Sequence, residues 1–210
     1  MKIAIITCTT PNRKWLYDIT NPGKTKYAAM HGYDYIFSDT FYPDPSKGVY
    51  WLKPAFIKEN ISEKYDWILW MDDDAGILKL DFDLELFIKE NEEFGKDIYA
   101  AEDLNGLNAG VLLLRSNDEN KSIFDFIYNS MEPVYKSAIY QDQSALLDIS
   151  KRLDVLKLVD GHILNAYDRL LTFSPKNQMT SDTFILHIAG GDEFKRHNFN
   201  RIKALFTEAV

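Results

Sequence analysis

The sequence predicts an α/β fold in which a mostly parallel central sheet is flanked by helices. Segments with strand character alternate with amphipathic segments along the 210 residues, and this alternation is typical of βαβ units. Residues 67–71 are apolar at every position, as a central parallel strand covered on both faces should be. The length suits one domain with a full core, so we expect a single domain over residues 1–210. Residues 204–210 resemble a helix that is cut short, which would make this the first domain of a longer protein.

The first half of the chain predicts three strands and three helices. Gly32 should end the first helix, because glycine is the usual residue just after a helix. Residues 39–50 contain Pro43, Pro45 and Gly48 and therefore predict a loop. We expect strands at residues 2–7, 33–38 and 67–71, and helices at residues 24–31, 52–60 and 83–91.

The second half continues the alternation. Its polar segment 173–182 predicts a loop, and no internal repeat is present. We expect strands at residues 97–101, 110–115, 155–159 and 184–187, and helices at residues 123–130, 141–151 and 199–208.

The strand at residues 67–71 ends in three adjacent carboxylates, Asp72, Asp73 and Asp74. Successive residues of an extended strand face opposite sides, so Asp72 and Asp74 are expected on one side and Asp73 on the other. Like charges this close repel one another unless water or a cation compensates them, and oxygen ligands suit Mg²⁺ and Mn²⁺. Ligands of open α/β sheets also bind at the carboxyl ends of strands. The pattern favours a metal site over the alternative, a solvated acidic turn.

The composition excludes several classes of function. A net charge of −8 and a pI near 5.0 argue against a nucleic-acid partner, which needs clustered Lys and Arg. The single cysteine, Cys8, excludes an intrachain disulfide and fits a reducing compartment. The sequence shows no signal peptide and no apolar run of the ~20 residues that a membrane span needs. We therefore expect a cytoplasmic protein without a membrane segment.

His187 ends the expected strand at residues 184–187, and Gly190 and Gly191 follow it closely. A lone histidine is more often structural than a ligand, but glycines let the backbone approach a ligand closely. A basic cluster beyond them would bind phosphate oxygens or form the solvated start of a helix. The cluster consists of Lys195, Arg196 and His197.

Three further segments contain polar side chains with two open interpretations each. Asn108 precedes Gly110 and either forms a turn that opens a strand or donates to sugar hydroxyls. Asp142 and Gln143 begin a helix, where they stabilise its first turn or lie near a reacting sugar carbon. Lys53 either pairs with the acidic triplet or a phosphate, or it lies on the surface.

Motifs of competing chemistries are absent from the sequence. It contains no G-x-x-x-x-G-K-[ST] phosphate loop, no G-x-G-x-x-G after the first strand and no G-x-S-x-G hydrolase motif. Paired carboxylates would still suit the hydrolysis of glycosides or phosphate esters.

The order of these segments resembles that of the GT-A glycosyltransferases, and most closely the galactomannan galactosyltransferase and xyloglucan xylosyltransferase family. Each segment is short, but six occur in the family's order and together span most of the chain. The matching segments are residues 26–33, 51–53, 67–75, 107–115, 142–146 and 187–190. The compact length is similar to the amino-terminal domain of chlorella-virus glycosyltransferases that decorate the capsid. The resemblance implies a GT-A, Rossmann-like nucleotide-diphospho-sugar transferase fold.

The resemblance also implies a chemistry. A hexose, deoxyhexose or pentose would move from a UDP-sugar donor to a glycan or glycoprotein acceptor, such as a viral capsid glycoprotein, with retention at the anomeric carbon. The triplet takes the place of the family's DxD motif, so that Asp72, Asp74 and His187 would hold Mn²⁺ or Mg²⁺. The residues that would contact the donor nucleotide are Thr7, Cys8, Thr9, Arg13, Lys53, Asp72, Asp73, Gly190 and Lys195. Those that would line the donor sugar are Asn108, Asp142 and Gln143.

The sequence departs from the family's pattern after His187. Gly191 stands where the family has a cysteine, and the expected basic residue is either Lys195 or Arg196. Retention needs a protein nucleophile, for which Asp142 is the candidate, or front-face attack by the acceptor, which we favour. The competing interpretations of the whole chain are a metal-dependent hydrolase of sugar or phosphate esters and a non-catalytic nucleotide-sugar-binding module.

Overall fold

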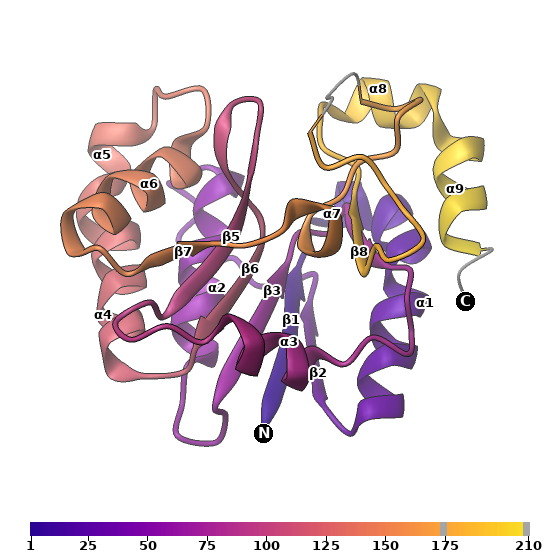
Figure 1. Ribbon diagram of the computed structural model, residues 1–210. Helices are drawn as coiled ribbons and strands as arrows, with labels where there is room; N and C mark the ends of the chain where they lie inside the picture. The colour runs from indigo at the N-terminus through magenta and orange to yellow at the C-terminus, as the bar shows by residue number, and fades with distance from the viewer. Residues whose placement is uncertain (173–175, 208–210) are drawn as a thin grey trace.

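The computed structural model, drawn as a ribbon in Figure 1, describes residues 1–172 and 176–207. In these residues six strands form one sheet, in the order β2-β1-β3-β6-β5-β7, and two short strands form another. The strands of the larger sheet are β1 (Ile3–Cys8), β2 (Asp34–Ser38), β3 (Trp67–Met71), β5 (Ile98–Asp103), β6 (Gly106–Arg115) and β7 (Leu156–Leu158). The smaller sheet pairs β4 (Ala75–Ile77) with β8 (Ile185–His187) in antiparallel orientation.

The larger sheet is mostly parallel, as the sequence predicts. β1 pairs in parallel with β2 and β3, and β5 pairs in parallel with β7. β6 runs antiparallel to both of its neighbours, β3 and β5. The first residues of β6 therefore lie at the same sheet edge as the carboxyl end of β3, and the Asp72 amide donates to the Gly110 carbonyl at 2.8 Å. This reversal places residues 108–110 beside the acidic triplet.

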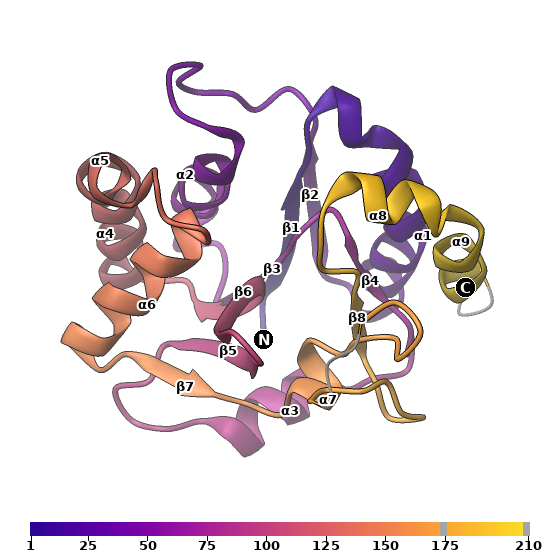
Figure 2. The same ribbon diagram turned by 90° about the horizontal axis from the view of Figure 1, so that it is seen from above.

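Helices cover both faces of the larger sheet (Figures 1 and 2). Ile68 and Trp70 of β3 pack in a core with α2, α4 and α6, whereas Trp67, Leu69 and Met71 pack in a core with α1 and α3. Both faces of β3 are thus buried, which explains its continuous apolar run. None of the described helices is both long enough and apolar enough to cross a membrane. The α-helices are α1 (Lys14–His31), α2 (Leu52–Asn60), α3 (Leu84–Asn91), α4 (Asp118–Phe126), α5 (Glu132–Tyr135), α6 (Gln141–Leu153), α7 (Gly161–Leu164), α8 (Asp192–His197) and α9 (Phe199–Thr207).

The structure differs from the prediction at the first helix. We expected it at residues 24–31, but α1 begins at Lys14 and contains Pro22. Proline removes one N–H from the helical hydrogen-bond ladder, so this position predicts an interruption. Buried side chains on both sides of it, among them Leu16 and Tyr27, pack against the rest of the protein and stabilise the longer helix.

The remaining predicted segments are present: the helix at residues 52–60 and the strand at residues 67–71 have the expected bounds, and the others have shifted ends. The helix expected at residues 123–130 begins at Asp118, because the Asn117 side chain accepts from the Asn120 amide and caps it. The prediction missed β4, which has only three residues. Residues 173–175 of the expected loop at 173–182, and residues 208–210 of the expected carboxyl-terminal helical segment, lie outside the described part of the chain.

Candidate active site

A cleft of about 400 Å³ opens at the carboxyl ends of β1 and β3. Its walls come from the loop after β1, the start of α2, the acidic triplet, the start of α6 and the turn into α8. The cleft thus lies at the sheet edge where open α/β folds bind ligands. Ten of the residues that the sequence predicted as site residues line it: Cys8, Thr9, Arg13, Lys53, Asp72, Asp73, Asp74, Asp142, Gly190 and Lys195.

Asp72 and Asp74 line this cleft, and His187, which is buried and not part of the lining, lies next to them. One ligand atom from each lies within 4.8 Å of the other two. The pairing of β4 with β8 produces the arrangement, because His187 is the register partner of Ala75 and the Ile188 amide donates to the Asp74 carbonyl at 2.9 Å. His187 Nε2 consequently lies 3.2 Å from Asp74 Oδ1.

The triplet itself is a turn rather than a continued strand. The Ala75 amide donates to the Asp72 carbonyl at 3.1 Å, and β3 ends at Met71. Asp72 and Asp74 nevertheless converge with His187, whereas Asp73 pairs with Arg13, and all three carboxylates line the same cleft. The grouping of Asp72 with Asp74 is the expected one, although a turn and not an extended strand produces it.

The three side chains fit a divalent cation. Two carboxylates and one imidazole nitrogen are suitable ligands for Mn²⁺ or Mg²⁺. Asp74 Oδ1 is buried and, within the described residues, accepts no hydrogen bond. A buried carboxylate oxygen normally has a partner, and a bound ion is one explanation when it has none. A cation held by Asp72, Asp74 and His187 would supply that partner.

Basic side chains surround the acidic triplet. Lys195 Nζ contacts Asp74 Oδ2, and Arg13 donates to both carboxylate oxygens of Asp73, at 2.6 and 2.8 Å. Burial alone would raise the pKa of Asp74, but its basic neighbours Lys195, His187 and Arg13 together outweigh burial and hold that pKa well below its ordinary value. Asp74 is therefore ionised at neutral pH. The Thr9 hydroxyl also donates to Asp73, so the Asp73 carboxylate is held by protein groups at the cleft wall.

Lys53 joins the triplet to the start of α6. Its Nζ lies 3.2 Å from Asp72 Oδ1 and 3.1 Å from Asp142 Oδ2, and it donates to the Ala109 carbonyl at 2.9 Å. Burial would lower the pKa of Lys53, but the negative charges of Asp142 and Asp72 outweigh burial and raise it. Lys53 is thus a permanent cation between two carboxylates that face the cleft, and not a surface lysine.

The turn after β8 brings Lys195 back to the cleft. Gly190 has a φ of 121°, a conformation that residues with a side chain rarely adopt, so glycine is required there. Lys195 is 1% exposed and lines the cleft, whereas the Arg196 guanidinium lies 4.5 Å over the Trp15 ring, away from the triplet. Of the two basic residues that spacing leaves open, the structure therefore places Lys195 in the cleft.

Asn108 lies below the cleft rather than in its wall. Its Nδ2 donates to Asp103 Oδ2 at 2.8 Å and to the Tyr167 hydroxyl at 2.9 Å, and its Oδ1 accepts from the Gly110 amide at 2.8 Å. Both amide hydrogens are thus donated to buried protein groups. We expected these hydrogens to be donated to sugar hydroxyls. In the structure they are donated to the protein, because the start of β6 is buried under the triplet.

Three other expected ligand contacts are also constrained by protein partners or burial. Thr7 is fully buried, and its hydroxyl donates to the Met71 carbonyl, so it lies beneath the cleft. Gln143 Oε1 accepts from the Ala109 amide at 2.9 Å. Cys8 does line the cleft, but burial raises the pKa of its thiol to about 12, so the group is neutral at pH 7.

The sequence did not predict the residues that contact the triad from the side of the core. His187 Nδ1 lies 2.9 Å from Asn165 Oδ1, and Asn165 Nδ2 donates to the Tyr167 hydroxyl at 3.1 Å. Lys24 of α1 is fully buried and donates to the Asp72 carbonyl at 3.0 Å. Burial lowers the pKa of Lys24 to about 8. Only the topology reveals these contacts, because no local motif marks Asn165, Tyr167 or Lys24.

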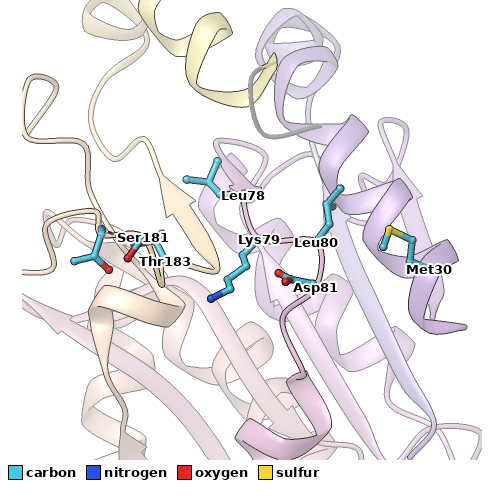
Figure 3. A pocket seen from close by; sticks show the side chains of 8 residues that line it. Met30, Leu78, Lys79, Leu80, Asp81, Ser181 and Thr183 are labelled. Atoms are coloured by element: carbon cyan, nitrogen blue, oxygen red, sulfur yellow. Dashed lines mark hydrogen bonds between the residues drawn. The ribbon is translucent and has the colours of Figure 1, made fainter.

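A second hollow, of about 350 Å³, lies at the other end of the β4–β8 pair. Its lining comes from α1, the segment after β4 and the loop before β8 (Figure 3). Lys79 in its wall already pairs with Asp182 at 3.2 Å. Ile77 pairs with Ile185 at this end, whereas Ala75 pairs with His187 at the other, so the hollow is separate from the triad. The residues that line it contain no cluster of acidic and basic groups comparable to that of the cleft.

Comparisons with known proteins agree with this architecture. The profile of the galactosyl transferase GMA12/MNN10 family matches residues 2–96. An uncharacterized α-1,2-galactosyltransferase of Schizosaccharomyces pombe is 28% identical over 226 residues, which cover 87% of this chain and 58% of that protein. Across the curated relatives that it matches, the chain spans between 20% and 58% of their length.

Solved structures show the fold. A glycosyltransferase involved in glycosylation of the major capsid of PBCV-1 has a TM-score of 0.73 and 15% identity, covering 94% of this chain and 98% of that chain. A Drosophila β1,4-galactosyltransferase 7 mutant in complex with manganese, UDP-Gal and xylobiose has a TM-score of 0.52 and 15% identity, covering 94% of this chain and 73% of that chain. These structures show that the fold is that of the GT-A glycosyltransferases, and the family profile matches residues 2–96, which is less than half of the chain.

Proposed function

We propose that this protein is a metal-dependent, retaining glycosyltransferase that moves a hexose, deoxyhexose or pentose from a UDP-sugar to a glycan or glycoprotein acceptor. The observation that carries the proposal is the Asp72, Asp74 and His187 triad, whose two carboxylates line a cleft together with the basic residues Arg13, Lys53 and Lys195. Carboxylates for a cation and basic groups for phosphates in one cleft are what a nucleoside diphosphate requires. The metal and nucleotide in the Drosophila relative, named above, support the same assignment.

The cation would be held by Asp72, Asp74 and His187. Mn²⁺ or Mg²⁺ would act as a Lewis acid that stabilises negative charge on the departing diphosphate. Lys195 would contribute to the same task, because its ammonium lies at Asp74, beside the expected position of the diphosphate. Arg13 holds Asp73 and pairs with Asp192, so its role is to fix the wall of the cleft around the nucleotide.

The donor sugar would lie towards the start of α6. Asp142 lines the cleft and pairs with Lys53, so it is a fixed anion that can accept hydrogen bonds from sugar hydroxyls. Gln143 binds the Ala109 amide through Oε1, which orients its Nε2 group. We favour front-face attack by the acceptor over a covalent intermediate on Asp142, because the ion pair with Lys53 weakens Asp142 as a nucleophile.

The proposal is tested by incubating the protein with UDP-glucose, UDP-xylose, UDP-galactose and UDP-rhamnose, with Mn²⁺ or with a chelator. Acceptor glycans are included in one arm and left out of the other. We expect transfer from one donor that needs both Mn²⁺ and acceptor, and loss of that transfer in His187→Ala. His197→Ala is the matched control, since His197 is exposed at the end of α8. Rapid sugar release without acceptor would indicate a hydrolase, and UDP binding without any turnover would indicate a binding module.

The acceptor is expected to be a glycan or a glycoprotein, with a viral capsid glycoprotein as one case to test. Val49 and Tyr50 line the cleft, and Tyr50 is 56% exposed. Sugar rings stack on exposed aromatic side chains, so we propose that the acceptor lies against this side of the cleft.

A further inference from the structure

We propose that Asn165, Tyr167 and Asp103 form a buried hydrogen-bonded chain that keeps the His187 proton on Nδ1 and leaves Nε2 free to bind a cation. These three residues would be positioning residues of the metal site, and none of them touches the cleft. The inference rests on the proposed function, because it concerns the cation that the triad would hold.

The chain of contacts is continuous from His187 to a carboxylate. His187 Nδ1 lies 2.9 Å from Asn165 Oδ1, Asn165 Nδ2 donates to the Tyr167 hydroxyl at 3.1 Å, and that hydroxyl donates to Asp103 Oδ2 at 3.0 Å. All four residues are buried: Asn165 is 0% exposed, Tyr167 1%, His187 5% and Asp103 8%. Hydrogen bonds between buried groups are shielded from water, so an unpaired member would be costly.

The direction of each hydrogen bond follows from the carboxylate. An ionised Asp103 only accepts, so the single Tyr167 hydroxyl proton is donated to it. Burial, together with the negative charge of Asp103, raises the pKa of Tyr167, so the hydroxyl keeps its proton at neutral pH. The Tyr167 oxygen then accepts hydrogen bonds from Asn165 and Asn108.

This direction fixes the amide of Asn165. Its NH₂ group faces Tyr167, and therefore its carbonyl oxygen faces His187 Nδ1. A flipped amide would place its oxygen against the Tyr167 hydroxyl, whose only proton is already donated to Asp103. Since a carbonyl oxygen can only accept, His187 Nδ1 must carry the proton, and a neutral imidazole then has its lone pair on Nε2. Nε2 is the nitrogen that lies 3.2 Å from Asp74 Oδ1.

The backbone holds Asn165 at this place. The Ala166 amide donates to the Ile185 carbonyl at 3.0 Å, and the His187 amide donates to the Ala166 carbonyl at 2.8 Å. The segment that follows α7 thus runs beside β8 and keeps Asn165 next to the imidazole. Partners of this kind behind a metal-binding histidine commonly change metal affinity by about 10- to 100-fold when they are removed.

The test uses the intact protein and Mn²⁺ alone, without donor or acceptor. Asn165→Ala removes the acceptor at Nδ1, and Tyr167→Phe removes the hydroxyl that orients Asn165. The matched control is Asn120→Ala, because Asn120 is also fully buried and donates to two backbone carbonyls, those of Asp97 and Arg115. Circular dichroism and thermal unfolding report whether each variant folds.

Two readouts separate positioning from mere stability. The first is the tautomer of His187 in the metal-free protein, read from ¹⁵N–¹H correlations of histidine-labelled samples and assigned with His187→Gln. The second is the affinity for Mn²⁺, measured by calorimetry. We expect the Nδ1–H tautomer in the wild type and a mixture of tautomers in Asn165→Ala. We expect Mn²⁺ affinity about 10- to 100-fold lower in Asn165→Ala, about tenfold lower in Tyr167→Phe and unchanged in Asn120→Ala.

Two results would overturn the inference: an Nε2–H tautomer in the wild type, or an unchanged tautomer and unchanged Mn²⁺ affinity in both Tyr167→Phe and Asn165→Ala. If Asn165→Ala does not fold, Tyr167→Phe alone decides, because it removes one oxygen and keeps the ring. If the wild type binds no Mn²⁺, the metal dependence in the proposed function fails. The tautomer in the metal-free wild type and in Tyr167→Phe then decides the inference separately.

Discussion

A Cβ atom on Gly110 would lie 2.1 Å from Cε1 of His187, so the imidazole ring occupies the space that a side chain at position 110 would need. The ring is therefore enclosed between the backbone of β6 and its hydrogen bond to Asn165. This close approach fixes the direction in which Nε2 points.

Gly110→Ala should displace the His187 ring and weaken Mn²⁺ binding by at least about tenfold, because a ligand that is moved loses its geometry. Calorimetric titration of Mn²⁺ measures the effect. Gly48→Ala is the matched control, since a Cβ there would meet only ordinary contacts at 3.8 and 4.0 Å. Equal Mn²⁺ affinity in Gly110→Ala and the wild type would contradict the role of this contact.

Lys195→Met should have opposite effects on two ligands. Lys195 Nζ forms an ion pair with Asp74 Oδ2, so its removal leaves that oxygen available to a cation. Mn²⁺ alone should therefore bind to the variant at least as tightly as it binds to the wild type. UDP in the presence of Mn²⁺ should bind about tenfold or more weakly, because a cation at the diphosphate is lost. Arg196→Met, which removes the cation over Trp15 and its hydrogen bond to the Asn12 carbonyl, should change neither affinity. Unchanged UDP affinity in Lys195→Met would exclude a phosphate contact.

Asp142→Asn should lower kcat by about 100-fold while UDP affinity changes little, since the lost anion would act on the sugar and not on the nucleotide. The same substitution leaves Lys53 with Asp72 as its remaining carboxylate partner. The control is Asp148→Asn on the same helix, where the carboxylate bonds Tyr135 and Arg152 away from the cleft. Steady-state kinetics and UDP calorimetry distinguish the two variants. A kcat in Asp142→Asn close to that of Asp148→Asn would remove Asp142 from the reaction.

Lys24 predicts a pH dependence of stability. Burial lowers its pKa from 10.5 to about 8 in the folded protein. The unfolded state then binds more protons between pH 8 and 10.5, so the contribution of Lys24 to the free energy of unfolding rises with pH in that window. A shift of this size corresponds to about 3 kcal/mol.

The measurement compares urea unfolding of the wild type and Lys24→Met at pH 7.5, 9 and 10. Groups common to both proteins cancel in the difference, which should shift in favour of the wild type as the pH rises. A difference that stays constant with pH would show that the pKa of Lys24 is not lowered.

Much of the site could be predicted from the sequence because its main parts are marked locally. The acidic triplet follows an apolar strand and His187 ends another, so both could be named as site residues, although the β4–β8 pairing that joins them was not predicted. Lys53 and Asp142 each lie at the start of a helix at the same edge of the sheet. The sequence could therefore name a role in the site as one of the two interpretations for each residue.

The parts that could not be predicted depend on contacts between distant segments. Asn165 and Tyr167 follow a four-residue helix and carry no recognisable spacing, yet they hold His187. Asn108 is the opposite case. Its position in the sequence suggested that its side-chain amide donates to a sugar, but in the structure the amide donates to Asp103 and the Tyr167 hydroxyl. Hydrogen-bond partners of a buried amide are set by the packing of the whole chain and leave no periodic pattern.

The central claim is that Asp72, Asp74 and His187 bind a cation that holds a nucleoside diphosphate. Its most direct test is calorimetric titration of UDP into the wild type and His187→Ala, each with saturating Mn²⁺ and with a chelator. We predict that Mn²⁺ tightens UDP binding to the wild type by at least about tenfold, and that folded His187→Ala shows no such difference. Equal UDP affinity of the wild type with Mn²⁺ and with the chelator would contradict the claim.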